Sequence, residues 1–121
     1  MKEYVFDIDP VAKPRQTRSD KWQKRDAVLR YREFADTLRL LCLKNGFTAL
    51  DTLNVLFVIP FPKSYSVKTK SALDGRPHQI KPDIDNLTKA VLDALLKDDS
   101  FVWKINAEKR WGHKGKIIIT Q

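Results

Sequence analysis

The alternation of hydrophobic and polar positions divides the chain into a few strands and helices. Residues 2–8 alternate with a period of two, which predicts a strand. Residues 52–59 are apolar on both faces, as is typical of a central strand. Residues 101–111 and 116–120 alternate again and flank the turn-forming Gly-His-Lys-Gly of residues 112–115, so we expect a hairpin there.

Two other stretches repeat their apolar side chains at helical spacing. The first follows Ser19 or Asp20, either of which can cap it, and ends at Asn45-Gly46, a common C-terminal stop. The second begins at Asp83, a residue type that favours the N-cap position. Its predicted buried stripe consists of Ile84, Leu87, Val91, Ala94 and Leu95.

Residues 63–80 separate the central strand from the second helix and have no hydrophobic period. Connections of this length inside a compact domain are usually functional or mobile. The element order is therefore β-α-β-loop-α-β-β. Because 121 residues suit one domain, we expect residues 1–121 to form a single α/β (α+β) domain, a mixed four-stranded sheet with two helices packed on one face.

Composition narrows the class of protein. The formal charge of +8 favours an anionic partner, and nucleic acid fits better than a membrane. No positively charged start leads into an apolar segment, and no apolar run approaches the roughly 18 residues of a membrane span, so we expect a cytoplasmic protein. The single cysteine, Cys42, lies among leucines and is interpreted as a buried core thiol. Neither His78 nor His113 has the spacing of a zinc ligand.

The basic residues concentrate in residues 13–32 and 63–81. Clusters of this kind neutralise DNA phosphates and make affinity strongly dependent on salt. The residues that we expect to contact DNA are Lys13, Arg15, Arg18, Lys68, Lys70, Arg76 and Lys81. Arg30, Arg32 and Arg39 fit better as the solvated face of a helix.

Against this positive charge, five of the fifteen carboxylates fall within residues 81–99. They are Asp83, Asp85, Asp93, Asp98 and Asp99. Clustered acids are tolerable when they are solvated, paired with cations or neutralised by a divalent metal. Magnesium binds few carboxylates together with waters and substrate phosphates, so this set indicates metal-dependent phosphate chemistry. The spacing is equally compatible with an ordinary helix in which Asp83 is a cap and Asp85 pairs with Lys89.

Three short motifs carry a resemblance to a known family. They are Lys81-Pro82-Asp83-Ile84-Asp85-Asn86-Leu87-Thr88-Lys89, Asp93-Ala94-Leu95 and Asp98-Asp99-Ser100-Phe101-Val102. In these residues the chain resembles the RusA family of Holliday junction resolvases. The resemblance implies a homodimeric, magnesium-dependent endodeoxyribonuclease of DNA recombination and repair. Such an enzyme cuts four-way DNA junctions symmetrically and leaves 5′-phosphate and 3′-hydroxyl ends.

The resemblance also implies roles for individual residues. By motif position, Asp83, Asp85 and Asp99 match the catalytic aspartates that bind Mg²⁺, and Lys89 matches the family's essential lysine. The connector that precedes Asp98 is several residues shorter than in the best-known member, which leaves Asp98 as the alternative third ligand.

Aromatic side chains add two expectations. We expect Trp103, Ile105 and Trp111, which are in phase, to lie in the core or at a dimer interface, and Tyr65 is a candidate for insertion at a junction centre.

Two other functions stay open. A non-catalytic DNA-binding protein would use its aspartates only as caps. A magnesium-dependent nucleotide hydrolase would need a compact base pocket, which the sequence does not indicate.

Overall fold

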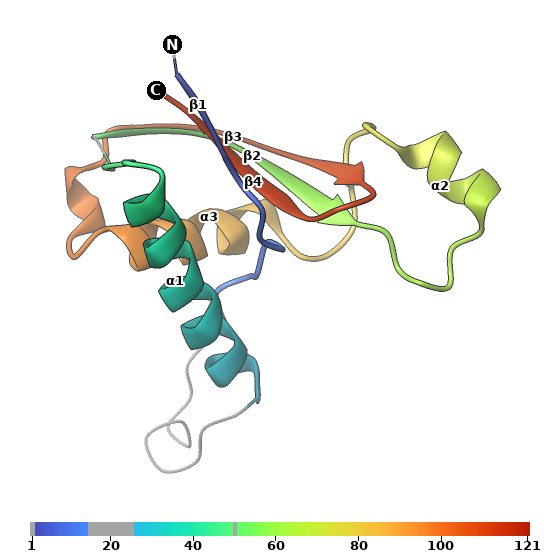
Figure 1. Ribbon diagram of the computed structural model, residues 1–121, viewed down its shortest axis with the longest axis horizontal. Coiled ribbons are helices and arrows are strands. Elements are labelled where there is room, and N and C mark those ends of the chain that lie inside the picture. The colour runs from blue at the N-terminus through green and yellow to red at the C-terminus, as the bar shows by residue number, and fades with distance from the viewer. Residues whose placement is uncertain (1, 15–25, 50) are drawn as a thin grey trace.

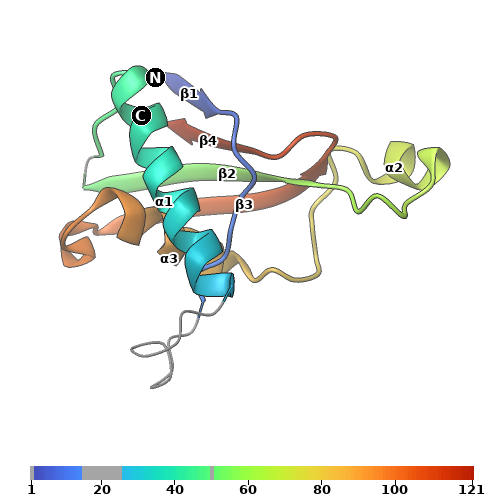
Figure 2. The same ribbon diagram turned by 60° about the horizontal axis from the view of Figure 1, so that its bottom comes forward.

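The computed structural model describes residues 2–14, 26–49 and 51–121 (Figure 1). Its four strands are β1 (Glu3–Phe6), β2 (Thr52–Pro60), β3 (Lys104–Gly112) and β4 (Lys116–Thr120). Its helices are α1 (Asp26–Lys44), α2 (Val67–Leu73), α3 (Ile84–Leu95) and the short 3₁₀ helix η2 (Asp99–Phe101). The strands form one mixed sheet in the order β1-β4-β2-β3, which Figure 2 shows edge to edge. The predicted α+β class and four-stranded sheet are confirmed.

Strand β2 is an interior strand, as its two apolar faces predict. It pairs in parallel with β3 over its whole length, from Thr52 opposite Lys104 to Pro60 opposite Gly112. On its other side it pairs antiparallel with β4, which in turn pairs antiparallel with β1. Parallel neighbours need a long crossover connection. Helix α3 lies in that crossover, and this connection brings the start of α3 close to β3.

The predicted hairpin of residues 101–111 and 116–120 is wrong. β3 and β4 lie on opposite sides of β2 and do not pair with each other. Both segments are strands, and Ile117 and Ile119 of β4 are buried as the alternation predicts. A period of two reports the faces of a strand but not its neighbours. Here the apolar β2 fills the place between the two segments.

Helices α1 and α3 pack against each other and cover one face of the sheet (Figures 1 and 2). The largest fully buried side chains come from the sheet and from both helices: Phe6, Phe57, Leu38, Leu87, Ile117, Ile119 and Val91. Burying one such side chain contributes about 1.5–3 kcal/mol relative to leaving it exposed. Cys42 is part of this core, and burial raises the pKa of its thiol to about 11. The thiol is therefore a core group, as predicted.

The connection at residues 63–80 is not a plain loop, because it contains α2. Ser66 caps this helix, since its side chain accepts a hydrogen bond from the Thr69 N–H at 3.1 Å. No residue of α2 is buried, which explains why no hydrophobic period revealed it. The helix projects beyond the end of the sheet, away from α1 and α3 (Figure 1). The described part of the chain therefore contains three α-helices, where the sequence predicted two.

Three further expectations have mixed outcomes. Leu87, Val91 and Ala94 of the predicted stripe are buried, but Ile84 is exposed at the start of α3. The in-phase residues Trp103 and Trp111 do not share an environment, because Trp111 of β3 is 6% exposed, whereas Trp103, directly before this strand, is 71% exposed. The expected caps at Ser19 or Asp20 lie outside the described residues. Among the described helices, none combines the length and the hydrophobicity of a membrane span.

Candidate active site

Helix α3 begins at Asp83, as predicted, but the carboxylate of this residue does not cap the helix. Asp83 has the extended backbone of an N-cap residue, and its carbonyl accepts the Leu87 N–H at 3.1 Å, yet its side chain makes no cap hydrogen bond. Asp85 lies in the first turn, and one of its oxygens accepts the Asn86 N–H at 2.9 Å. Both side chains are exposed, at a helix N-terminus where the peptide dipoles favour negative charge.

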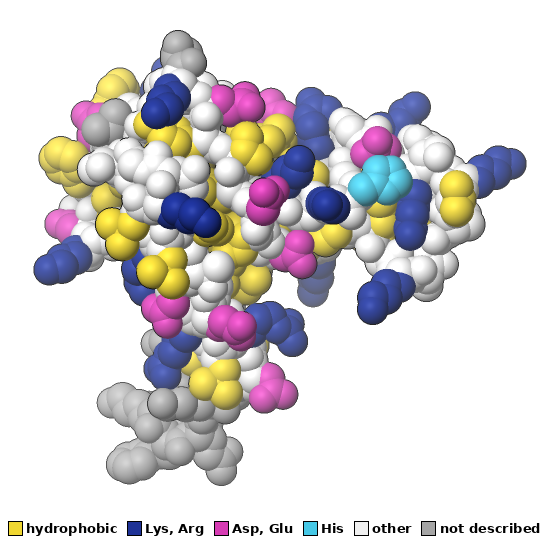
Figure 3. Space-filling model, viewed as in Figure 1, with side chains coloured by type: hydrophobic (Ala, Val, Ile, Leu, Met, Phe, Trp, Pro, Cys, Tyr) yellow, Lys and Arg dark blue, Asp and Glu magenta, His cyan; other side chains and the backbone are white. Residues whose placement is uncertain are grey.

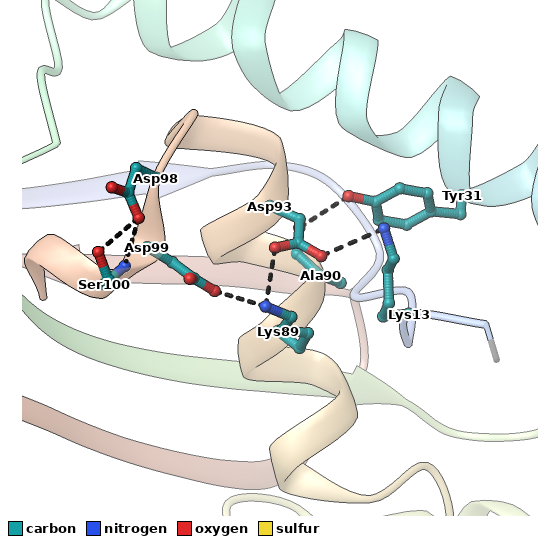
Figure 4. A network of polar contacts seen from close by, with 8 residues as sticks. All are labelled: Lys13, Tyr31, Lys89, Ala90, Asp93, Asp98, Asp99 and Ser100. Carbon is teal, nitrogen blue, oxygen red and sulfur yellow. Dashed lines mark hydrogen bonds and ion pairs between the residues drawn. The ribbon is translucent and has the colours of Figure 1, made fainter. Parts of the chain in front are cut away.

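Lys89 lies one turn further along α3 and faces two other carboxylates. Its Nζ is 2.5 Å from Asp99 Oδ2 and 3.2 Å from Asp93 Oδ1 (Figure 4). The hydrogen bond with Asp99, followed by that with Asp93, raises the pKa of Lys89 above its usual value. The alternative prediction of an Asp85–Lys89 pair is therefore wrong: among the described ion pairs, the partners of Lys89 come from the next turn of α3 and from η2.

Lys13 belongs to the same network. Its Nζ is 3.2 Å from Asp93 Oδ2 and 4.3 Å from the centre of the Tyr31 ring, so one carboxylate bridges two ammonium groups. The backbone N–H of Lys13 also donates to the Asn86 carbonyl at 3.0 Å, which fixes this segment alongside α3. Lys13 was expected to contact DNA. In the structure its ammonium group is turned inward to Asp93 and is only 26% exposed.

The two candidates for the third ligand point in different directions. Asp98 Oδ1 accepts hydrogen bonds from the N–H and the hydroxyl of Ser100, at 3.0 and 2.6 Å, and caps η2. These bonds, the hydroxyl bond first, lower the pKa of Asp98. Asp99 instead extends toward Lys89 (Figure 4). The structure thus brings Asp99, and not Asp98, to the lysine.

The carboxylate oxygens of Asp83 and Asp85 are suitable ligands for a hard cation, although the acidic side chains do not surround a common centre. Within residues 2–14, 26–49 and 51–121, no three His, Cys, Asp or Glu side chains converge into a metal site. Magnesium requires only one or two protein carboxylates, because waters and substrate phosphates complete its shell. Asp83 and Asp85 meet that requirement. An open depression between α3 and β3, lined by Asp85, Lys89 and Ile105 among others, leaves room beside them.

The remaining basic candidates lie on and after α2. Lys68 and Lys70 are on the helix, and Arg76 and Lys81 follow it; all but Lys70 are exposed. In Figure 3, Lys and Arg side chains surround this projecting part of the molecule. The predicted DNA contacts Arg15 and Arg18 lie outside the described residues.

Sequence reasoning missed Lys109. Its Nζ donates to the carbonyls of Ile80 and Pro82, at 2.5 and 2.6 Å, and so fixes the backbone that leads into Asp83. Lys109 lies two residues before the buried Trp111 and therefore on the same face of β3. Because lysine is rarely buried unless it is paired, a lysine in phase with Trp111 could have indicated such a contact.

His78 is also buried, with 3% of its surface exposed, and the centre of its ring lies 4.3 Å from the centre of the Trp111 ring. Its Nδ1 makes no hydrogen bond within the described structure. Desolvation, and secondarily the charge of Lys109, lowers the pKa of this imidazole. His78 is therefore a packing residue beside Trp111, whose ring also stacks on Phe61.

Comparison with known proteins agrees with this arrangement. The family model for the endodeoxyribonuclease RusA matches residues 7–120, which is nearly the whole chain. The matched range includes α3 with its aspartates and Lys89, η2, and every other described helix and strand except β1. A search of the curated proteins finds no match. The family match alone spans more than half of the chain, and the chain belongs to the RusA endodeoxyribonuclease family.

Proposed function

We propose that this protein is a magnesium-dependent endodeoxyribonuclease that resolves Holliday junctions by symmetric paired nicks, in DNA recombination and repair. One observation carries the proposal: the Asp83 carboxylate stands at the start of α3 without serving as its cap, beside Asp85 and one turn from Lys89. Family membership supports nuclease chemistry. The non-catalytic alternative needs Asp83 as a cap and Asp85 as a partner of Lys89, and neither interaction is formed.

Each residue of the site has a chemical role in this proposal. Asp83 and Asp85 would hold Mg²⁺, with Asp99 joining them from η2. When bound, the ion supplies an activated water and stabilises charge on the scissile phosphate. Lys89 would donate to a phosphate oxygen, which replaces the Asp99 oxygen that it contacts now.

The DNA surface that we propose runs from the active site onto the projecting α2. Lys68, Lys70, Arg76 and Lys81 would contact phosphates on this side, together with Arg15 and Arg18. Tyr65 is partly buried, and its ring packs on Trp111 at 5.8 Å, so it is poorly placed as a wedge at the junction centre.

A homodimer is part of the proposal, because cutting two opposed strands of a symmetric junction calls for two sites related by a two-fold axis. The start of β3 supports it. Ile105 of the edge strand β3 is 48% exposed, and Phe101 and Trp103, which directly precede this strand, are 69% and 71% exposed. Exposed apolar side chains on an edge strand favour self-association.

The test is cleavage of a labelled four-way junction and a matched linear duplex, each with and without Mg²⁺. We expect paired nicks in the junction only, and only with the metal. Asp83→Asn, which remains a competent N-cap, is the inactive control. Equal cutting of both substrates would contradict junction selectivity, and cutting by the Asp83→Asn variant would contradict the proposed site.

A further inference from the structure

We infer that Asp93 and Lys13 form a positioning pair that holds Lys89 in place for catalysis. The motif resemblance gives neither residue this role. The inference rests on the proposed function, in which Lys89 acts on the scissile phosphate. Neither Asp93 nor Lys13 contacts the reacting atoms in this proposal. Both act through Lys89.

The first argument is the division of the Asp93 carboxylate between two cations. Oδ1 lies 3.2 Å from the Nζ of Lys89, and Oδ2 lies 3.2 Å from the Nζ of Lys13 (Figure 4). An exposed i,i+4 ion pair alone orders its side chains weakly. Here the Asp93 side chain is only 25% exposed, and its second oxygen is paired with Lys13, whose side chain is 26% exposed.

The second argument is that Lys13 is itself fixed. Its backbone N–H donates to Asn86 at 3.0 Å, and its ammonium lies over the face of Tyr31. The Tyr31 ring is 9% exposed, and its hydroxyl donates to the carbonyl of Ala90 at 3.4 Å. The chain of contacts therefore runs from the buried interface between α1 and α3 to the ammonium of Lys89.

The third argument concerns what remains when Asp99 is engaged elsewhere. Asp99 holds Lys89 through Oδ2, and a carboxylate that turns to a metal ion no longer offers that oxygen fully to an ammonium. Asp93 then becomes the remaining carboxylate partner of Lys89. Because Lys13 shares the charge of Asp93, Lys89 also keeps part of its positive charge uncompensated. That charge is what a phosphate oxygen requires.

Asp93→Asn tests the pair in the full-length protein. We expect kcat for junction cleavage to fall by about 10- to 100-fold, the usual cost of removing a residue that orients a functional group. The Kd for the junction without metal should change less than twofold. Asp93→Glu should recover part of kcat, because it keeps the carboxylate. The matched control is Asp36→Asn, which removes an aspartate from an exposed helical ion pair with Arg39 and should retain wild-type kcat.

Two readouts separate positioning from a merely structural role. In a Lys89→Ala background, Asp93→Asn should lower residual cleavage no further, because residues that act as a unit are not additive. In the metal-free protein, the NMR order parameter of the Lys89 Cε should fall in Asp93→Asn and in Lys13→Met but not in Asp36→Asn.

The outcomes also separate this inference from the proposed function. If the wild type cuts junctions and Asp93→Asn retains its kcat, the positioning pair is refuted while the nuclease stands. An equal loss of cleavage from Asp93→Asn with and without Lys89 refutes it as well. If the wild type cuts no junction, the proposed function fails, and the order parameter of Lys89 decides alone: no change in Asp93→Asn overturns the pair.

Discussion

At the scale of single residues, Asp83 and Asp98 use their carboxylates differently. Asp83 occupies the N-cap position without using its side chain as a cap, whereas Asp98 uses its side chain to cap η2. The same residue type therefore serves two purposes within sixteen positions of the chain. The difference is visible in hydrogen bonds and not in composition.

Asp83→Asn or Asp85→Asn should reduce magnesium-dependent cleavage by more than about 100-fold, beyond the usual cost of losing an orienting residue. A neutral amide is a poor ligand for a hard cation. Stability should change by less than about 0.5 kcal/mol, as for other exposed substitutions, and metal-free junction affinity should stay level or rise because one negative charge beside the phosphate is gone. Cleavage assays, thermal unfolding and titration of labelled junction measure the three quantities. Full activity in both variants would refute the site.

Asp99→Asn and Asp98→Asn form a matched pair of neighbours. We expect Asp99→Asn to lose cleavage, because it faces Lys89. Asp98→Asn should remain active, because its oxygen accepts bonds from Ser100 and Asn caps as well as Asp. Cleavage rates at saturating magnesium compare the two. Loss of activity in Asp98→Asn alone would reverse the assignment.

At the scale of elements, the sequence predicted those helices and strands whose buried face requires apolar side chains at regular spacing. The faces of β2 and the stripe of Leu87, Val91 and Ala94 could be read because the core requires apolar side chains at those positions. Helix α2 could not be read, since it buries nothing. The pairing partner of β3 was also hidden, because alternation fixes a face and not a neighbour.

For the candidate site, too, the sequence revealed the local motif but not the tertiary contacts. The α3 motif and Lys89 were recognisable from residue types and order. The contacts of Lys89 join Asp93 of α3, Asp99 of η2 and, through Asp93, Lys13 from the segment between β1 and α1. These residues are brought together by tertiary structure, including the hydrogen bond from the Lys13 N–H to the Asn86 carbonyl of α3.

Helix α2 should contribute to DNA binding through its lysines. Replacing both Lys68 and Lys70 by Ala should reduce the slope of log Kobs against log salt by about 2, or roughly 1 for each lost phosphate contact. The double variant Arg30→Ala, Arg32→Ala on the solvated face of α1 is the control and should keep the wild-type slope. Titrations of metal-free protein at several salt concentrations give both values. An unchanged slope in the α2 variant would move the DNA surface elsewhere.

The packing of His78 against Trp111 should make the stability of the protein depend on pH. The pKa of buried His78 lies below its ordinary value of 6.5, chiefly because burial disfavours the charged ring. As pH falls through about 6.5, the unfolded state takes up a proton that the folded state does not, so the free energy of unfolding decreases. Thermal unfolding between pH 7.5 and about 5.5 should show this decline. His78→Gln should flatten it, and the exposed His113→Gln should not.

At the scale of the whole molecule, the two edges of the sheet differ, and this difference favours one of them as the surface through which two copies associate. In the described part of the chain, β1 at one edge pairs only with β4, and at the other edge Ile105 of β3 and Trp103, directly before this strand, are exposed. Residues 76–78 cover the last part of the β3 edge, through the hydrogen bonds of Trp111 with Arg76 and of His78 with Lys109. Within the described residues, the first half of β3 has no such cover. Ile105 also lines the depression beside Asp85 and Lys89.

Joining two copies through the start of β3 would therefore place the two proposed active sites near the two-fold axis, as the proposed paired nicking requires. Trp103→Lys, which lies outside that depression, should convert a dimer at micromolar concentration into a monomer, because a charged side chain at a sheet edge opposes association. Sedimentation measures the change, and thermal unfolding should be little affected because Trp103 is exposed. Lys104→Ala, at the neighbouring exposed position, is the control and should remain dimeric.

The same variant distinguishes association from chemistry. On a supercoiled cruciform plasmid, coordinated cleavage within one bound complex gives linear product, whereas independent single cuts give nicked circles. We expect the wild type to give linear product and the monomeric variant to accumulate nicked circles, because its intact Asp83, Asp85 and Lys89 still cut one strand at a time. A variant that stays dimeric would move the interface away from β3. A wild type that sediments only as a monomer, and yet linearises the cruciform, would show that paired nicking does not require a stable dimer.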